Sequence, residues 1–448
     1  MTVNDHRRAV PSARRRIPLV GNALSLLHDP VAFLTSLHRQ GDIVRVHIGA
    51  WPVYFVTTPE LVWQVLVTDA GDFELGRILE RQRVVFRNGI VTADGDLHRR
   101  QRLLMQPAFH RSRIEHYITT MNEHANAMAG AWRPGQCLAL DEHLHELMLT
   151  IITSTMFSAD PAAAAVAEVR RSLPLIAKGV MMRSALPPVF DRLPIPLNRR
   201  FTAASKRLRA IIIEIIDNHG GDGHDLLSLL RTARDDQGRP MSREQLCDEL
   251  IGIMLGGTEA TANIVAWAFH ELAQAPHCAD RLGDEIDTVL GGRQPGGKDL
   301  TRLPYTANII NETLRLHSPL LNMRRATQPV RIAGVTLPTG TEVAFSPYVL
   351  HRDPRLHDQP DRFVPERWDT EDPALSHTMF LPFAAGPHKC IGESFARAEI
   401  AITIATIASR WRLHAAPGNQ VREVLASVPR PNALPMVVQQ RRTDLLPR

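Results

Sequence analysis

The most informative part of this chain is the ten-residue segment from Phe383 to Gly392, FAAGPHKCIG. Cys390 lies just before a stretch of helical periodicity that begins near Glu393, and the positive end of a helix dipole lowers the pKa of a thiol. Gly386 lets the backbone take a positive φ angle and pass close to a neighbouring group. The stretch therefore predicts a loop that holds a thiolate. For a lone cysteine a buried structural side chain is the alternative interpretation, so the other motifs of the chain have to decide.

A second motif pairs a helix with an irregular segment. Glu312 and Arg315 share one face of a helix predicted over about residues 305–317, because positions i and i+3 are neighbours on a helix. Alone, Glu and Arg at this spacing usually form a solvated pair. The Pro-rich segment downstream contains residues 365–368, PERW, which offers a second basic side chain for the same carboxylate.

The longest helical pattern carries a third motif. It begins at a capping-box match, Ser242 to Gln245, and continues to Ala275, which corresponds to about 50 Å of helix. Residues 256–261, GGTEAT, lie midway along it. A fourth motif, residues 94–109, DGDLHRRQRLLMQPAF, predicts a shorter basic helix. The chain is therefore mainly helical, with a strand pair predicted over residues 40–58 and short strands elsewhere.

Together these four motifs resemble the cytochrome P450 family. Residues 383–392 match its F-x-x-G-x-[R/H]-x-C-x-G pattern, and residues 256–261 follow its [A/G]-G-x-[D/E]-T-T pattern except at Ala260. The resemblance covers nearly the whole chain. It implies a mainly α fold, the α-helical prism with a small β-rich lobe of that family. We expect one domain over residues 17–448, after a disordered basic leader over residues 1–16.

The resemblance implies a heme b (haem b) cofactor with Cys390 as the axial ligand of its iron. A thiolate ligand pushes electron density onto iron and favours cleavage of the O–O bond. Phe383 would cover the sulfur, and Gly386 and Gly392 would let the loop approach the porphyrin. The haem propionates would be bound by four cationic or imidazole side chains, namely His98, Arg102, Arg324 and His388, with Arg325 as an open alternative to Arg324.

Glu312, Arg315 and Arg367 would form a buried ionic cluster that ties a helix to the segment before the Cys390 loop. Removal of one member of such a cluster strands a buried charge. We therefore interpret these three residues as structural and not catalytic.

The catalytic expectations concern residues 256–261. Glu259 would deliver protons to bound oxygen, in a groove opened by small residues on one helix face. Ala260 departs from the family pattern, which has Thr there, and Thr261 points about 100° away around the helix. Three explanations are open: a substrate hydroxyl or water substitutes, Thr258 contributes, or oxygen activation is poorly coupled. The expected substrate-pocket residues are Gly256, Gly257, Leu320, Leu321, Asn322 and Met323.

The resemblance implies a monooxygenase that inserts one oxygen atom from O2 into a C–H bond of an apolar small molecule. The run of sequence is similar to bacterial terpene hydroxylases of the pentalenene oxygenase-like group, so a cyclic terpene of secondary metabolism is the expected substrate. The alternatives are a haem-thiolate enzyme for an already oxygenated substrate, a peroxygenase or coupling enzyme, and a haem-free binding protein. Electrons would come from NAD(P)H through a separate ferredoxin and ferredoxin reductase, for which Arg99 and Arg100 offer a docking surface.

Composition excludes several other classes. The 448 residues carry a formal net charge of +5, and aromatic residues make up 5%. The basic residues are scattered, which argues against nucleic-acid binding. The four cysteines form no CxxC pair and no zinc pattern, which fits a reducing, cytoplasmic compartment. We see no apolar run that predicts a membrane anchor.

Overall fold

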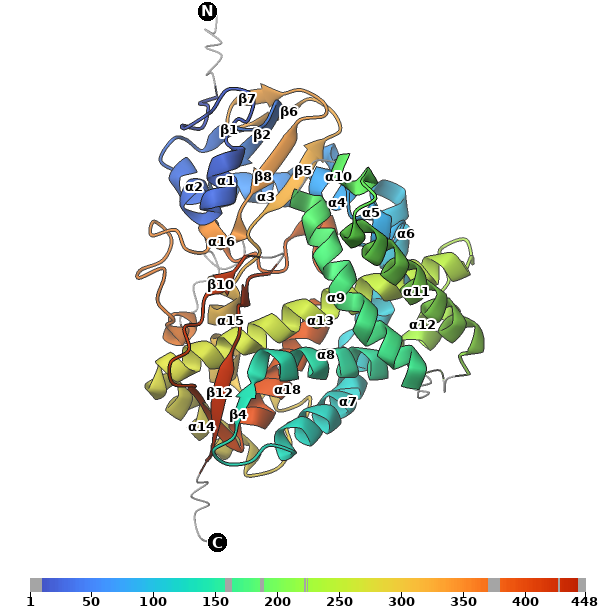
Figure 1. Ribbon diagram of the computed structural model, residues 1–448, viewed down its shortest axis with the longest axis vertical. Helices are drawn as coiled ribbons and strands as arrows, with labels where there is room; N and C mark the ends of the chain where they lie inside the picture. The colour runs from blue at the N-terminus through green and yellow to red at the C-terminus, as the bar shows by residue number, and fades with distance from the viewer. Residues whose placement is uncertain are drawn as a thin grey trace, which may run out of the picture. The chain divides into compact units, whose positions relative to one another are not determined.

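The computed structural model describes residues 10–441 except for 158–162, 186–188, 221–222, 224, 370–378 and 426–427. These residues form two compact units, which we describe separately (Figure 1). The β unit contains the described residues of 1–81, 318–362 and 372–390. The helical unit contains the described residues of 82–317, 363–371 and 391–448. The prediction of a mainly α chain with small sheets is confirmed.

A five-stranded sheet is the centre of the β unit. β1 (Ile43–Ile48) and β2 (Trp51–Val56) form the antiparallel hairpin predicted over residues 40–58. The sheet continues with β8 (Glu342–Phe345), which is parallel to β2, then antiparallel β5 (Asn322–Ala326) and β3 (Phe73–Leu75). Successive side chains of β1 enter two different apolar clusters, as expected because strand residues alternate between faces.

Short helices surround this sheet. They are α1 (Ala23–His28), α2 (Pro30–Leu37), α3 (Pro59–Trp63), α4 (Arg77–Glu80) and α16 (Pro347–Leu350), the π-helix η1 (Gln64–Thr68) and the 3-10 helices η2 (Ala70–Asp72) and η6 (Gly386–His388). β6 (Val330–Ile332) and β7 (Val335–Leu337) form a separate hairpin.

Residues 10–16 differ from the disordered leader expected over residues 1–16. The Ala13 N–H donates to the Arg45 carbonyl at 2.9 Å, and the Arg45 N–H donates to the Pro11 carbonyl at 2.8 Å. Ala13 is buried. This segment is therefore held along β1, while residues 1–9 lie outside the described part of the chain.

The helical unit is built around α13 (Arg243–Gln274), which contacts α8 (Leu140–Met156), α11 (Pro196–Asn218) and α18 (Glu393–Ala408) (Figure 1). Its start is capped as predicted, because the Ser242 hydroxyl accepts from the Gln245 N–H at 3.1 Å. Among the described residues, α13 alone is long and apolar enough to cross a bilayer, and 67% of its most apolar window is buried. This burial is typical of a core helix.

The remaining helices of this unit are α5 (Arg83–Phe86), α6 (Gly95–Met105), η3 (Gln106–Phe109), α7 (Arg111–Gly130), α9 (Ala163–Ala185), α10 (Val189–Arg192), α12 (Leu226–Thr232), α14 (Pro276–Leu290), η4 (Leu300–Arg302), α15 (Pro304–Leu316) and η5 (Pro365–Asp369). Its strands are β4 (Cys137–Ala139), β9 (Trp411–Ala415) and β12 (Pro435–Gln440) in one sheet, and β10 (Glu423–Val424) and β11 (Arg430–Pro431) in another.

Candidate functional site

The Cys390 loop of the β unit is closed by backbone hydrogen bonds. The Cys390 N–H donates to the Phe383 carbonyl at 2.9 Å, and the Lys389 N–H donates to the Gly386 carbonyl at 3.0 Å. The side chain of Cys390 is exposed. The loop therefore presents the sulfur to a ligand and fixes the backbone that carries it.

Gly386 is at a position that only glycine can occupy. Its φ angle is +70°, and a Cβ there would lie 1.8 Å from the Leu66 carbonyl oxygen of η1. Because that neighbour is backbone, it cannot move aside as a flexible side chain can. The absent side chain lets the loop pack directly on η1.

Glu312 is the centre of a buried cluster in the helical unit. Its two carboxylate oxygens accept from Arg315 Nε and Nη2, both at 2.9 Å, and from Arg367 Nε at 2.9 Å. The Val364 N–H and the Trp368 indole donate to the same carboxylate at 2.9 and 3.0 Å. Burial alone would raise the pKa of Glu312, but the hydrogen bond and charge of Arg315, the Val364 N–H and the charge of Arg367 together outweigh it and lower this pKa.

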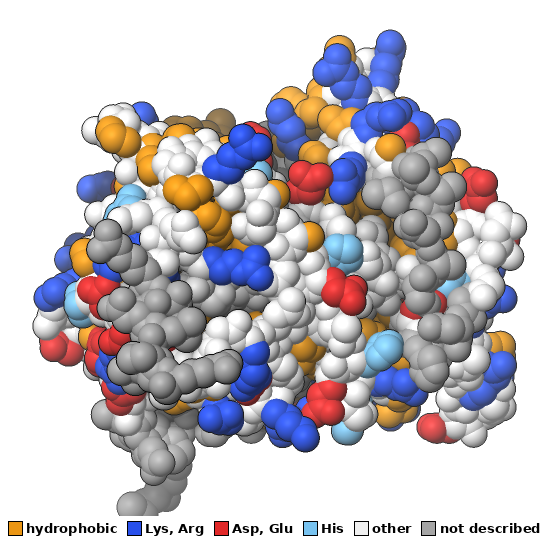
Figure 2. Space-filling model, turned by 90° about the horizontal axis from the view of Figure 1, so that it is seen from below, with side chains coloured by type: hydrophobic (Ala, Val, Ile, Leu, Met, Phe, Trp, Pro, Cys, Tyr) orange, Lys and Arg blue, Asp and Glu red, His pale blue; other side chains and the backbone are white. Residues whose placement is uncertain are grey.

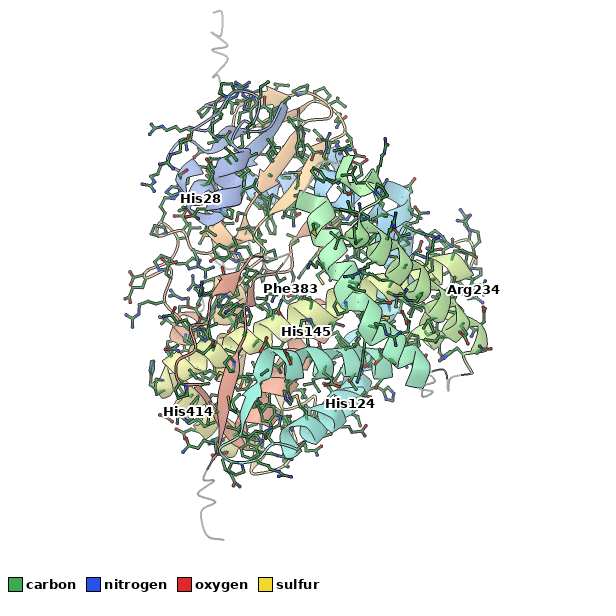
Figure 3. The ribbon with its side chains drawn as sticks, viewed as in Figure 1. His28, His124, His145, Arg234, Phe383 and His414 are labelled. Atoms are coloured by element: carbon green, nitrogen blue, oxygen red, sulfur yellow. The ribbon has the colours of Figure 1, made fainter. Side chains whose placement is uncertain are left out.

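The middle of α13 has an open face. Gly256 is exposed, and a Cβ there would meet no atom within 4 Å. Ala260 and Glu259, four and three residues later, border the same face. His145 of α8 lies beside α13 (Figure 3). Burial lowers the pKa of His145, whereas the charge of Glu259 acts in the opposite direction.

The two threonines of this segment are turned to other faces. Thr258 and Thr261 are buried, and their hydroxyls donate to the carbonyls of Met254 and Gly257 at 2.7 and 2.6 Å. Thr258 is about 200° from Gly256 around the helix, so it lies on the opposite face. The Thr258 hydroxyl is therefore not on the face where Ala260 replaces the threonine of the family pattern.

The four residues expected at the propionates are divided between the units. His98 and Arg102 are on α6 of the helical unit, and Arg324 and His388 belong to the β unit. Arg324 is buried, and its guanidinium donates to the Asn322 side chain at 3.1 Å.

Arg325, the alternative to Arg324, is already paired. Its guanidinium contacts Glu342 at 2.9 Å, Glu80 at 2.6 Å and Glu74 at 3.3 Å. Three carboxylates therefore neutralise this cation, which leaves Arg324 as the candidate of the two for an anionic partner.

Arg100 has a structural role that the sequence did not indicate. It contacts Asp235 at 2.6 Å and donates to the Gln245 side chain at 3.2 Å, which is the side chain expected to close the capping box. Arg99, by contrast, has a side chain that is 76% exposed. Of the two arginines of the predicted docking surface, Arg99 is therefore the more exposed.

The residues expected at the substrate pocket from β5 and the segment before it lie mostly in the core of the β unit. Met323 is buried in an apolar cluster, and Leu320 and Leu321 pack against the same cluster. Asn322 accepts from Arg324. The side chain of Met323 fills the space beside Gly76, and its part in a substrate pocket stays a prediction.

Comparison with known proteins decides the family. The profile described as "Cytochrome P450" matches residues 11–438. This chain belongs to the cytochrome P450 family. The P450 is similar over its length to three enzymes of Streptomyces, each of which covers more than 90% of the chain.

Three Streptomyces oxygenases are similar to this P450 over most of its length. Cyclooctatin synthase of Streptomyces melanosporofaciens is 39% identical over 91% of this chain and 90% of its own length. Cyclooctat-9-en-7-ol 5-monooxygenase of the same organism is 37% identical over 95% and 94%. Pentalenene oxygenase of Streptomyces avermitilis is 35% identical over 96% and 98%. The P450 is therefore a monooxygenase, as predicted.

The fold is also that of a solved relative. The crystal structure of the haem domain of cytochrome P450DA superposes with a TM-score of 0.85, covering 97% of this chain and 98% of the other, at 24% identity. The expected P450 fold is confirmed.

The residues of the P450 fit a haem-thiolate cofactor, which the family implies. The sulfur of Cys390 is exposed on a loop whose backbone is pinned. Phe383 precedes it on the same loop (Figure 3). Gly256 leaves open space above its own backbone, as a bound ligand requires.

The sequence analysis assigned no role to two further buried residues of this P450. His351 is fully buried, contacts Ser318 Oγ at 2.6 Å, and accepts from the Leu381 N–H at 2.9 Å, just before the Cys390 loop. The match of residues 351–354 to the family's H-R-D-P turn was the only signal for it. It therefore supports the loop.

Glu399 of α18 is the second buried residue to which the sequence analysis assigned no role. It is fully buried, and burial raises its pKa to about 8, while the nearby Thr261 hydroxyl acts in the opposite direction. The Thr261 hydroxyl donates its hydrogen bond to the Gly257 carbonyl. Within the described part of the chain, no hydrogen bond to either Glu399 oxygen is found. Helical periodicity alone does not predict that the carboxyl group of Glu399 is buried beside Thr261.

Proposed function

We propose that this P450 hydroxylates a cyclic terpene in bacterial secondary metabolism, with Cys390 as the thiolate ligand of haem b iron. The observation that carries this proposal is the full-length similarity to Streptomyces oxygenases named for cyclooctatin, cyclooctat-9-en-7-ol and pentalenene. Insertion of one oxygen atom into a C–H bond releases the other atom as water and consumes two electrons. We propose NAD(P)H as their source, through a ferredoxin and its reductase in the cytoplasm.

Each protein group has a defined part in this proposal. The haem, bound through Cys390, supplies the activation of O2. His98, Arg102, Arg324 and His388 would bind its two propionates by charge-assisted hydrogen bonds. Gly256 and Ala260 leave room for the reacting groups, and Glu259 at the edge of this face would hold and pass protons. Glu399 would keep a second exchangeable proton beside Thr261.

A panel of cyclic terpenes tests the proposal. Each terpene is titrated into the haem-loaded protein, because a productive ligand displaces the water on iron and changes its spin state. Ligands that bind are then incubated with ferredoxin, ferredoxin reductase and NADPH, or with peroxide alone. We expect a monohydroxylated product that needs the redox partners. Lack of any response to terpenes, or equal turnover with peroxide, contradicts this proposal.

A second candidate, an already oxygenated terpene as substrate, is favoured by the placement of the threonines. Thr258 and Thr261 donate to helix carbonyls, and Ala260 offers no hydroxyl on the open face. A substrate hydroxyl could supply the missing hydrogen bond, and one relative is named for an alcohol, cyclooctat-9-en-7-ol.

This candidate is tested with pairs of a terpene and its alcohol. We expect more product per NADPH consumed with the alcohol in the wild-type protein. In Ala260→Thr the difference between the two should shrink, because the protein again supplies the hydroxyl. Equal coupling for both members of a pair in the wild type contradicts it.

A further inference from the structure

An apolar patch lies on the surface of the β unit, on α1 and on the turn before it. Among the described residues, twelve large hydrophobic side chains are exposed, and five of them lie within residues 17–27. These five residues, which we call the α1 patch, are Ile17, Leu19, Val20, Leu24 and Leu27. A single exposed leucine is ordinary, but a gathered set of this kind marks an interaction surface.

The helix α1 presents two of these side chains on one face. It lies at the surface of the β unit, and none of its six residues is buried (Figure 1). Leu24 and Leu27 are three positions apart, so they share a face of the helix. Leu26 is about 200° from Leu24 around the helix and packs against an apolar cluster of the β unit. The inner face of α1 therefore contributes to the core, while Leu24 and Leu27 face solvent.

A fixed turn carries the other three side chains of the patch. The Ile17 N–H donates to the Gly21 carbonyl at 2.9 Å, and the Gly21 N–H donates to the Ile17 carbonyl at 2.8 Å. Gly21 has a φ angle of +67°, and a Cβ there would collide with the His47 carbonyl oxygen, so the turn packs directly on β1. Leu19, at the tip, is 96% exposed and has a φ angle of 65°, which is uncommon for a residue with a Cβ. Because the turn is held in place, little conformational entropy would be lost when it binds a partner.

Three consecutive arginines precede the turn. Arg14, Arg15 and Arg16 are exposed, and their side chains make no hydrogen bond or ion pair with a described residue. Residues 10–28 contain no Asp or Glu. Burial, and then the charge of Arg16, lower the pKa of His47 on β1, which places Arg16 close to the strand that carries the turn. The segment therefore combines an apolar tip with unpaired positive charge.

We propose that the α1 patch binds the surface of an anionic phospholipid membrane. Leu19, Leu24 and Leu27 would enter the boundary between the headgroups and the acyl chains, and the three arginines would contact the lipid phosphates. Apolar side chains beside clustered basic ones bind such a surface through apolar burial and charge attraction together. The contact is peripheral, without a spanning helix, and it does not depend on which substrate is oxidised at the haem.

Co-sedimentation of the haem-loaded protein with lipid vesicles tests the proposal. One set of vesicles contains phosphatidylglycerol and phosphatidylcholine in equal amounts, and the other contains phosphatidylcholine alone. We expect the protein to bind the anionic vesicles with an affinity that falls as salt is added, because salt screens the charges. Binding to phosphatidylcholine alone should be at least about tenfold weaker.

Two variants separate the contributions of charge and apolar burial. Arg14→Gln/Arg15→Gln/Arg16→Gln should weaken binding to the anionic vesicles by at least about tenfold, since each arginine near an anionic surface contributes about fivefold. Leu19→Ser/Leu27→Ser should also weaken it by at least about tenfold, because two leucine side chains no longer leave water for the membrane. All five side chains are exposed, so the fold should tolerate these changes.

A matched triple variant, Arg111→Gln/Arg133→Gln/Lys298→Gln, removes three exposed cations from the helical unit. We expect it to bind the anionic vesicles as the wild type does. Equal loss in both triple variants, unchanged binding in Leu19→Ser/Leu27→Ser, or no binding of the wild type to either kind of vesicle overturns the proposal. A dimer of the free protein that dissociates in Leu19→Ser/Leu27→Ser, with vesicle binding unchanged, assigns the patch to a second copy of the chain and also overturns it.

Discussion

At the scale of single residues, Glu312 has the most demanding surroundings. Five donor groups converge on its carboxylate, and neither Glu312 nor Arg315 is exposed at all. Glu312→Gln would remove the negative charge that faces the buried Arg315 guanidinium. We expect the free energy of unfolding to fall by about 3–5 kcal/mol, as when one member of a buried ion pair is removed.

Urea unfolding of the haem-loaded protein measures this loss. Glu146→Gln is the matched control, because Glu146 pairs with Arg170 but its side chain is 64% exposed. An exposed pair of this kind contributes about 0–1 kcal/mol. A Glu312→Gln protein as stable as the control would show that the cluster is not needed for the fold.

Residue-scale predictions from sequence succeeded where the information is local or carried by a family pattern. The spacing of Glu312 and Arg315 is readable from the chain, and PERW supplies Arg367. The sequence could not indicate whether Arg324 or Arg325 is available to bind a haem propionate. It depends on three carboxylates that come from residues 74, 80 and 342, and only the folded sheet brings them together.

At the scale of elements, α13 is the best-predicted part of the molecule. The expected span from Ser242 to Ala275 agrees with the observed helix because a capping residue and Pro276 mark its ends locally. The partner of the Gln245 side chain could not be predicted, since Arg100 is 145 residues away. Likewise, the support of the Cys390 loop by His351 joins positions 30 residues apart.

The contact between α13 and α18 has a testable pH dependence through Glu399. Its pKa is raised by burial from 4.5 to about 8, so the folded protein keeps a proton that the unfolded chain releases. Between about pH 4.5 and pH 8 the unfolded state binds fewer protons, so stability from this group falls as pH rises.

Glu399→Gln keeps the shape of the side chain and removes its titration. We therefore expect the stability difference between variant and wild type to shift in favour of the variant as pH rises from 5 to 8. Free energies of unfolding measured at several pH values give this difference directly. A difference that is independent of pH would mean that Glu399 is ionised in the folded protein.

At the scale of the whole molecule, basic and acidic side chains are interspersed on the face shown in Figure 2. This agrees with the scattered arginines of the sequence. The length of 448 residues alone would have suggested several domains. The family pattern, and not length, predicted the fold that the P450DA haem domain shares.

The N-terminal segment offers a prediction at this scale. Residues 11–14 exchange backbone hydrogen bonds with Arg45 and accept one from the Asn22 side chain. A protein that begins at Ile17 lacks these contacts, and each lost hydrogen bond lowers the free energy of unfolding by about 1 kcal/mol. We expect the protein that begins at Ile17 to have a lower melting temperature than a protein that begins at Val10. Equal melting temperatures for the two truncated proteins would show that residues 10–16 add nothing to stability.

The proposed function depends on the bond between the sulfur of Cys390 and the haem iron. The absorption spectrum of the reduced, CO-bound protein measures this ligand most directly. We expect the strongly red-shifted Soret band of a thiolate-ligated haem in the wild type, and its loss in Cys390→Ala. A wild-type spectrum typical of nitrogen ligation, or an unchanged band in Cys390→Ala, would mean that Cys390 is not the iron ligand.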